Sequence, residues 1–188
     1  MKALKFIWAT SLCVALSMGI VSCGDDNEEI EPSPNKESSG KVSGHECVDL
    51  GLSVKWATCN VGASSPEEYG NYYAWANNIA ETQWGDKWRM PTETELRELC
   101  EKCTWTWTTQ GGKNGYEVTG PSKNSIFLPA AGYCHYGDVY DQGSLGRYWS
   151  STPFFSLNAY RLYFDSGYQY VDDSDRYGGY SVRAVLAE

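Results

Sequence analysis

The chain has 188 residues, of which 24 are acidic and 15 basic, and its formal net charge is −9. This balance argues against nucleic acid or an anionic bilayer as the partner, because both are themselves negatively charged. Aromatic residues are abundant, with eight Trp and fourteen Tyr against two His. The length corresponds to a single domain once the N-terminal segment is set aside.

Residues 1–22 have the pattern of a bacterial lipoprotein signal peptide. A basic start precedes an apolar run that is short for a membrane span. Residues 20–23, IVSC, resemble the lipobox, in which the cysteine becomes the lipidated first residue of the mature protein. This resemblance predicts lipidation at Cys23 and an outer membrane lipoprotein, and the acidic residues after it resemble a surface-export signal. An ordinary cleaved signal peptide is the alternative.

The segment after the lipobox is predicted to be a tether. Residues 23–45 are acidic and polar and lack the apolar side chains that a packed structure needs. We therefore expect a flexible tether over residues 23–45 and a globular domain over residues 46–188.

The strongest helix signal lies at about 92–103. Thr92 and Glu95 form an S/T-x-x-E capping box at its start. The apolar residues that follow at i, i+3, i+4 and i+7 are Leu96, Leu99, Cys100 and Cys103. These positions predict an amphipathic helix.

The rest of the domain has the short alternating runs typical of strands. Strands are predicted at 53–58, 71–75, 104–109, 116–119, 125–128, 159–165, 168–172 and 180–186, with a loop at 131–143 and a polar bend at 172–177. Many short, mostly antiparallel strands with one main helix predict an α+β fold.

Five segments together resemble the FISUMP family of bacterial lipoproteins. They are residues 48–75, 88–109, 115–133, 148–153 and 177–185. The resemblance implies a variant of the C-type-lectin-like fold, distantly similar to the formylglycine-generating, sulfatase-modifying proteins, with a variable surface near the C-terminus. Fold similarity of this kind implies no particular activity.

The domain has five cysteines, an odd number. They are Cys47, Cys59, Cys100, Cys103 and Cys134. The FISUMP resemblance implies a Cys59–Cys103 disulfide, because both match positions at which the family often carries cysteine; two buried thiols are the alternative. A redox pair at Cys100 and Cys103 is disfavoured, because this CxxC ends a helix instead of beginning one. A four-cysteine zinc site lacks the paired short spacings that such sites show.

Catalytic chemistry has little support in the sequence. His45 and His135 are isolated, so a Ser-His-Asp or Cys-His arrangement is not indicated. Formylglycine-generating enzymes need a copper-binding cysteine pair near the C-terminus, and no cysteine follows Cys134. No enzymatic activity and no cofactor are therefore expected, although the carboxylates of Asp165 and residues 172–175 leave Ca²⁺ open as an alternative.

We therefore predict a surface-exposed, non-catalytic recognition module that binds an extracellular glycan or protein. Tyrosines give large contact area at small entropic cost, and neighbouring charges orient a ligand. The predicted binding rim consists of Tyr168, Tyr170, Asp172, Asp173, Asp175, Arg176 and Tyr177. A structural subunit of a surface assembly, paired through edge strands, is the alternative. A further alternative is a sulfatase-modifying-factor-like oxidoreductase. A second open question is whether the C-terminal loop is diversified in sequence.

Overall fold

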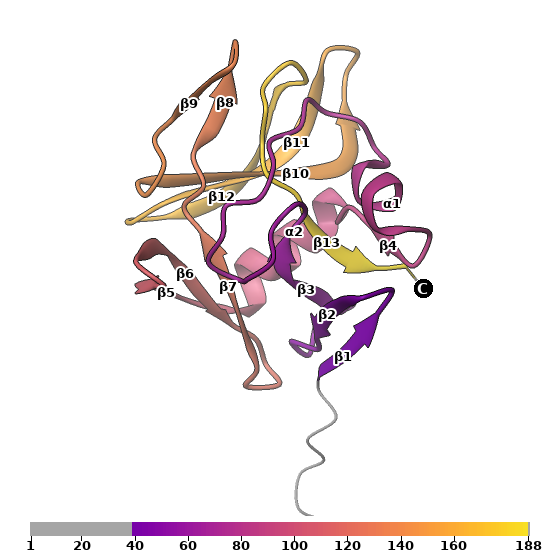
Figure 1. Ribbon diagram of the computed structural model, residues 1–188, viewed down its shortest axis with the longest axis vertical. Coiled ribbons are helices and arrows are strands. Elements are labelled where there is room, and N and C mark those ends of the chain that lie inside the picture. The colour runs from indigo at the N-terminus through magenta and orange to yellow at the C-terminus, as the bar shows by residue number, and fades with distance from the viewer. Residues whose placement is uncertain (1–38, 188) are drawn as a thin grey trace, which may run out of the picture. The chain divides into compact units, whose positions relative to one another are not determined.

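The computed structural model describes residues 39–187. The predicted signal peptide, the predicted lipidation site Cys23 and the predicted tether as far as residue 38 lie outside the described residues. Over residues 39–187 the chain forms thirteen strands and two helices (Figure 1). Neither helix in this range is both long and apolar enough to span a membrane.

The strands are β1 (Ser39–Val42), β2 (His45–Val48), β3 (Trp56–Asn60), β4 (Trp88–Arg89), β5 (Thr104–Gln110), β6 (Lys113–Thr119), β7 (Ser125–Pro129), β8 (Tyr133–His135), β9 (Asp138–Tyr140), β10 (Leu145–Phe154), β11 (Asn158–Asp165), β12 (Gln169–Asp175) and β13 (Arg183–Leu186), and the helices are α1 (Ile79–Trp84) and α2 (Glu93–Lys102).

The fold is mostly β, with 49% strand and 11% helix, so the predicted α+β class is wrong. The predicted helix exists as α2, and its capping box is complete: Thr92 Oγ1 accepts from the Glu95 N–H (3.2 Å) and Glu95 Oε2 accepts from the Thr92 N–H (2.7 Å). This helix has ten residues, and many more residues belong to strands, some of which the sequence pattern did not predict, above all β10. In β10 three successive residues, 148–150, are buried, which hides the alternation typical of a strand.

The predicted tether also contains a strand. Residues 39–45, which belong to the predicted tether, form β1, the turn that follows it and the first residue of β2. β1 pairs with β2 in the register Ser39↔Val48 to Val42↔His45. The Val42 carbonyl also accepts from the indole N–H of Trp88 (3.1 Å). The prediction was wrong here because backbone hydrogen bonds hold this polar segment, and its one apolar residue, Val42, packs against buried residues of the core.

The strands form antiparallel sheets with the orders β1-β2-β3-β13-β4, β5-β6-β7, β10-β11-β12 and β8-β9. The first sheet places the C-terminal strand β13 between β3 and β4, so the two ends of the domain share one sheet. The predicted strand at 71–75 is reduced to a single bridge between Tyr73 and Tyr180. The predicted bend at 172–177 is also wrong in its first half, since β12 continues to Asp175.

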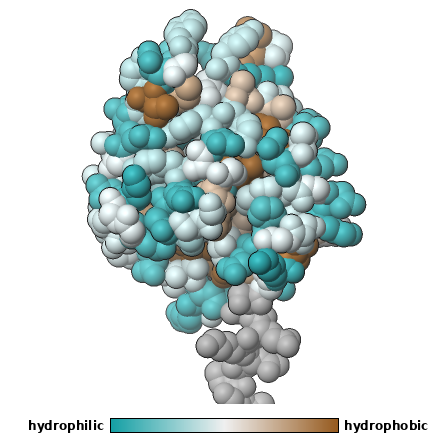
Figure 2. Space-filling view, viewed as in Figure 1, coloured by the Kyte–Doolittle hydropathy of each residue, from teal (hydrophilic) through white to brown (hydrophobic). Residues whose placement is uncertain are grey.

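Two buried clusters hold these sheets together. The first packs α2, through residues such as Leu99, against the inner face of β10-β11-β12 (Leu162, Phe164) and the β5-β6-β7 sheet. The second gathers Trp88 and Trp149 around β13. The face seen in Figure 2 is largely hydrophilic, with small, separate hydrophobic patches, as expected when most large apolar side chains are inside.

A polar network crosses the core at Arg183, whose side chain is 1% exposed. Its guanidinium donates to Asn60 Oδ1 (3.0 Å), the Thr58 carbonyl (2.9 Å) and the Phe127 carbonyl (2.9 Å). Tyr148 donates to a carbonyl of β7 (2.6 Å) and accepts from Asn60 Nδ2 (3.2 Å). Burial lowers the pKa of Arg183 and raises the pKa of Tyr148. The network joins β3, β7, β10 and β13.

Candidate functional site

An open cleft of about 640 Å³ lies between the β8–β9 hairpin and the outer face of the β10-β11-β12 sheet. Figure 1 shows this hairpin and the segment between β12 and β13 at the same end of the domain. The cleft is lined by Tyr133, His135, Tyr136, Arg147, Ser174, Asp175, Tyr177, Gly178 and Tyr180. Its volume is within the range of roughly 300–1,000 Å³ typical of small-ligand sites.

The β8–β9 hairpin forms one wall of the cleft. Tyr136 (φ 49°) and Gly137 (φ 91°) both have positive φ between the paired residues His135 and Asp138, as a type I′ hairpin turn requires. Cys134 exchanges two backbone hydrogen bonds with Gly179 (2.7 and 2.9 Å). The hairpin is thereby joined to the segment that forms the opposite wall.

The floor of the cleft is built around Arg147. Its guanidinium lies 3.8 Å from the ring centre of Tyr133 and 5.4 Å from that of Tyr180, and its Nη1 donates to the Tyr180 hydroxyl (3.2 Å). That hydroxyl also shares a hydrogen bond with Ser174 Oγ (2.8 Å), and the Tyr180 ring stacks on the buried Trp149 (4.2 Å). These contacts hold the floor in one arrangement before any ligand arrives.

Two exposed tyrosines form the lips of the cleft. Tyr136 is 95% exposed and Tyr177 is 79% exposed, and they come from opposite walls. Asp175 supplies a carboxylate beside Tyr177. A cleft with aromatic faces at its rim, a cation on its floor and a carboxylate at one side can bind a ligand that has both apolar and hydroxyl-rich surfaces.

The predicted rim residues do not form one surface. Asp175 and Tyr177 line the cleft, but Tyr168 and Tyr170 stack on each other (5.8 Å) outside it. Tyr163 lies within 6.0 Å of both rings, so these three tyrosines form a ladder along β11 and β12. The alternation of β12 places this ladder on the outer face of the sheet, beside the cleft but not in it.

The remaining rim residues serve the fold. Asp173 accepts from Asn158 Nδ2 (2.6 Å), and Asp172 accepts from the Asp173 N–H (2.8 Å). Arg176 lies 4.2 Å from the Trp75 ring centre and donates to the Asn158 carbonyl (2.9 Å). Because β12 stays extended, neighbouring carboxylates point to opposite faces. Within residues 39–187 no three acidic, His or Cys side chains come together as metal ligands, so the Ca²⁺ alternative gains no support.

The sequence did not predict the other wall or the floor of the cleft. Tyr133, His135 and Tyr136 belong to the predicted loop at 131–143, which is the β8–β9 hairpin, and Arg147 and Tyr180 lie outside the predicted rim. The turn pair Tyr136-Gly137 between aromatic residues is the one sequence signal for this hairpin. Nothing in the sequence signals Arg147, because its contacts come from segments far away in the chain.

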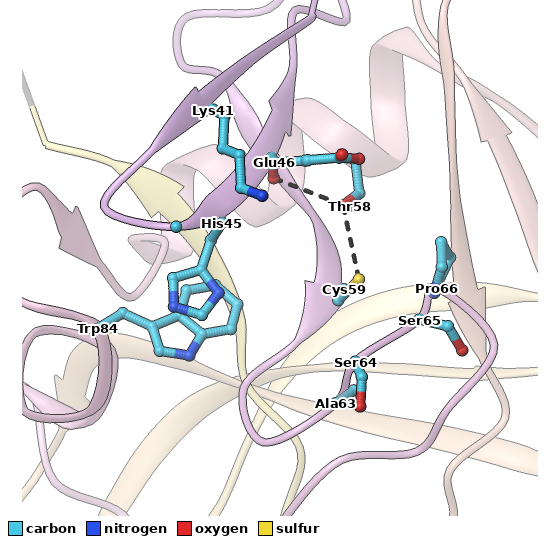
Figure 3. Close-up of a pocket in the computed structure, with 11 residues that line it drawn as sticks. Lys41, His45, Glu46, Thr58, Cys59, Ala63, Ser64, Ser65, Pro66 and Trp84 are labelled. Atoms are coloured by element: carbon cyan, nitrogen blue, oxygen red, sulfur yellow. Dashed lines mark hydrogen bonds between the residues drawn. The ribbon is translucent and has the colours of Figure 1, made fainter.

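The predicted Cys59–Cys103 disulfide is absent, and both thiols are free. Cys59 lines a second hollow, of about 450 Å³, together with Ser64 and Ser65. Figure 3 shows Cys59 with these two serines on the loop beside it. Cys103 instead packs against the first core cluster. Trp56 of β3 belongs to that cluster, so alternation along β3 turns Cys59 to the other face of the sheet. The two thiols are thus separated by the sheet itself.

We expect Cys100 and Cys103 to resist alkylation in the folded protein. Burial raises the pKa of Cys100 to about 12 and that of Cys103 to about 11, so the thiolate, the reactive species, is scarce at neutral pH. Native labelling with iodoacetamide at pH 8, followed by peptide mass spectrometry, should leave both unmodified, whereas labelling in urea should modify both. Rapid native labelling of either cysteine would contradict this and revive the redox-pair alternative.

The fold and the cleft together define a mostly β domain with an open, tyrosine-rich cleft. The chain belongs to the family described as the Lcl C-terminal domain, whose model matches residues 46–186. No curated protein and no solved structure matches the chain significantly.

Proposed function

We propose that the domain is a non-catalytic recognition module whose ligand is a glycan bound in the cleft between β8–β9 and β10-β11-β12. The observation that carries the proposal is the pair of strongly exposed tyrosines, Tyr136 and Tyr177, facing one preformed cleft from opposite walls. Aromatic side chains are enriched at protein interaction sites, and two of them flank this one cleft.

The chemistry of the cleft favours a sugar over a flat apolar ligand. Tyrosine rings offer apolar faces to the C–H faces of a sugar, while Asp175 and His135 offer hydrogen-bond partners for hydroxyls. The floor groups Arg147, Ser174 and Tyr180 are already hydrogen-bonded to one another. A floor fixed in this way suits binding better than catalysis, which needs a nucleophile or base free to react.

The proposal extends to the place of the protein in the cell. The lipobox at residues 20–23 and the resemblance of residues 48–185 to FISUMP lipoproteins support an outer membrane lipoprotein exposed on the surface. Anchoring through Cys23 would present the domain to extracellular glycans at the end of a short tether. The acidic net charge supports a partner other than nucleic acid.

We expect Tyr136→Ala and Tyr177→Ala each to weaken glycan binding about tenfold or more, since stacking contacts of this kind contribute about 1–2 kcal/mol or more. A glycan array would first identify a bound sugar, and titration calorimetry would then compare the variants. The physical reason is the loss of one aromatic wall from an otherwise unchanged cleft.

Tyr168→Ala is the matched control, because Tyr168 is a 54% exposed tyrosine in the turn between β11 and β12 and lies outside the cleft. It should bind as the wild type does. If Tyr168→Ala alone abolished binding, the tyrosine ladder and not the cleft would be the site. If the array detected no sugar at all, the glycan proposal would be wrong.

A further inference from the structure

One strand of the molecule has an open, uncharged edge. Within residues 39–187, β5 pairs with β6 alone, so one side of its backbone faces outward, and Figure 1 shows β5 at the margin of the domain. The two-residue turn Gly111-Gly112 makes Gln110↔Lys113 a hydrogen-bonded pair of the hairpin. By alternation, the N–H and C=O groups of Trp105, Trp107 and Thr109 point away from β6.

Three other strand edges, those of β12, β4 and β1, are short or charged. The free edge of the β10-β11-β12 sheet is β12, which carries three aspartates within its seven residues. The five-stranded sheet ends in β4, with two residues, and in β1, with four residues including Lys41. Short or charged edges of this kind prevent unwanted strand addition. β5, with the sequence TWTWTTQ, has neither charge nor proline.

β5 is also held rigid from one side. Trp105 and Trp107 pack edge-on against Tyr116 of β6 (5.2 and 5.0 Å), and the Trp105 indole N–H donates to the Leu99 carbonyl of α2 (3.1 Å). The threonines between them, such as Thr106, face outward and are exposed. The strand is therefore ready to pair without further ordering, which lowers the entropic cost of association.

We infer that β5 pairs with β5 of a second copy of this chain, antiparallel and around a two-fold axis at Trp107. Two copies of an acidic protein repel one another, and an edge without charge is where they can approach. With Trp107 opposite its own copy, Trp105 faces Thr109 of the partner, and their outward backbone groups supply six hydrogen bonds. The product is one continuous sheet of the order β7-β6-β5-β5-β6-β7.

This register has a consequence that can be tested. Thr106 lies opposite Thr108 of the other copy, with side chains on the exposed face, where like charges repel and opposite charges attract. The variant T106K/T108K places two Lys–Lys pairs across the axis. The variant T106K/T108E places two Lys–Glu pairs there instead. Both variants carry two charged residues at the same two positions, exposed Thr106 and half-buried Thr108, so they differ only in the sign of one charge.

Sedimentation velocity of the full-length chain in detergent, over a concentration series, is the measurement. The wild type and T106K/T108E should sediment as dimers, and T106K/T108K should shift to the monomer with at least about a tenfold weaker association, which corresponds to about 1.4 kcal/mol. Tryptophan fluorescence checks that each variant is folded. If the lysine pair does not fold, T106E/T108E serves as the repulsive variant.

A backbone variant provides an independent test. Thr109 forms a non-hydrogen-bonded backbone pair with Asn114, so Thr109→Pro removes an outward N–H and leaves the β5–β6 backbone hydrogen bonds in place. It also removes the exposed hydrogen bond from Thr109 Oγ1 to Asn114 Oδ1 (2.8 Å), and Thr109→Val, which loses that bond but keeps the N–H, is the control. Thr109→Pro should dissociate the dimer while the domain stays folded. A monomeric wild type, or equal behaviour of T106K/T108K and T106K/T108E, would overturn the inference. Neither result bears on glycan binding in the cleft, which β5 does not line.

Discussion

Arg183→Met should destabilise the domain by more than about 3 kcal/mol, because it leaves several buried oxygen acceptors without a donor at once. The guanidinium supplies hydrogen bonds to Asn60 and to backbone carbonyls of β3 and β7, and 1% of the residue is exposed. Urea unfolding followed by tryptophan fluorescence measures the loss.

Arg161→Met is the matched control for this prediction. Arg161 is also buried, at 9% exposure, but within the described residues its Nε and Nη1 have no hydrogen-bond partner. Its contacts are with the rings of Tyr163 and Tyr170. An apolar side chain of similar length should therefore cost less than about 1 kcal/mol there. Equal losses in the two variants would show that volume, and not the hydrogen-bond network, decides the effect.

The second large effect is expected at Gly132, where the chain enters the β8–β9 hairpin. Its φ is +68°, and a Cβ at this position would lie 2.0 Å from the Tyr140 carbonyl oxygen and 2.8 Å from the Gln142 nitrogen. Both obstacles are backbone atoms, so the hairpin has to move. Gly132→Ala should therefore cost at least about 2–3 kcal/mol and should also weaken ligand binding, because this hairpin is one wall of the cleft.

Gly137→Ala separates the two causes of that effect. Gly137 lies in the turn of the same hairpin and has φ +91°, but a Cβ there meets no atom within 4 Å. Gly137→Ala should therefore lower the free energy of unfolding by roughly 1 kcal/mol, which is the effect of placing alanine at a positive φ without a clash. Thermal unfolding and ligand binding are measured for both variants. The difference between Gly132→Ala and Gly137→Ala is the part of each loss that the steric clash causes. A loss at Gly137 as large as the loss at Gly132 would contradict the proposed clash.

These effects follow from the way the cleft is supported. Its floor rests on Trp149 through Tyr180, and its walls are joined by the Cys134–Gly179 backbone bonds. Each support connects residues that are at least thirty positions apart in the sequence. The site therefore depends on the closure of the domain, in which β13 enters the sheet between β3 and β4.

Local signals in the sequence were sufficient for several elements. The capping box at Thr92 and Glu95 located α2, and the alternation of Trp105 and Trp107 with threonines located β5. The strands predicted at 159–165 and 168–172 also exist, as the neighbours β11 and β12. In each case the information lies within a few neighbouring residues, since capping, alternation and turn formation are short-range effects.

The tertiary structure alone decided the class of the fold, the state of the cysteines and the composition of the cleft. β8 and β9 have three residues each, too few for a visible period, and β10 loses its alternation because successive residues are buried. Cys59 and Cys103 lie on opposite sides of a sheet whose strands come from both ends of the domain. Tyr136, Arg147 and Tyr177 meet because three distant segments pack together. Such contacts depend on how the elements pack, and no short-range pattern in the sequence encodes that packing.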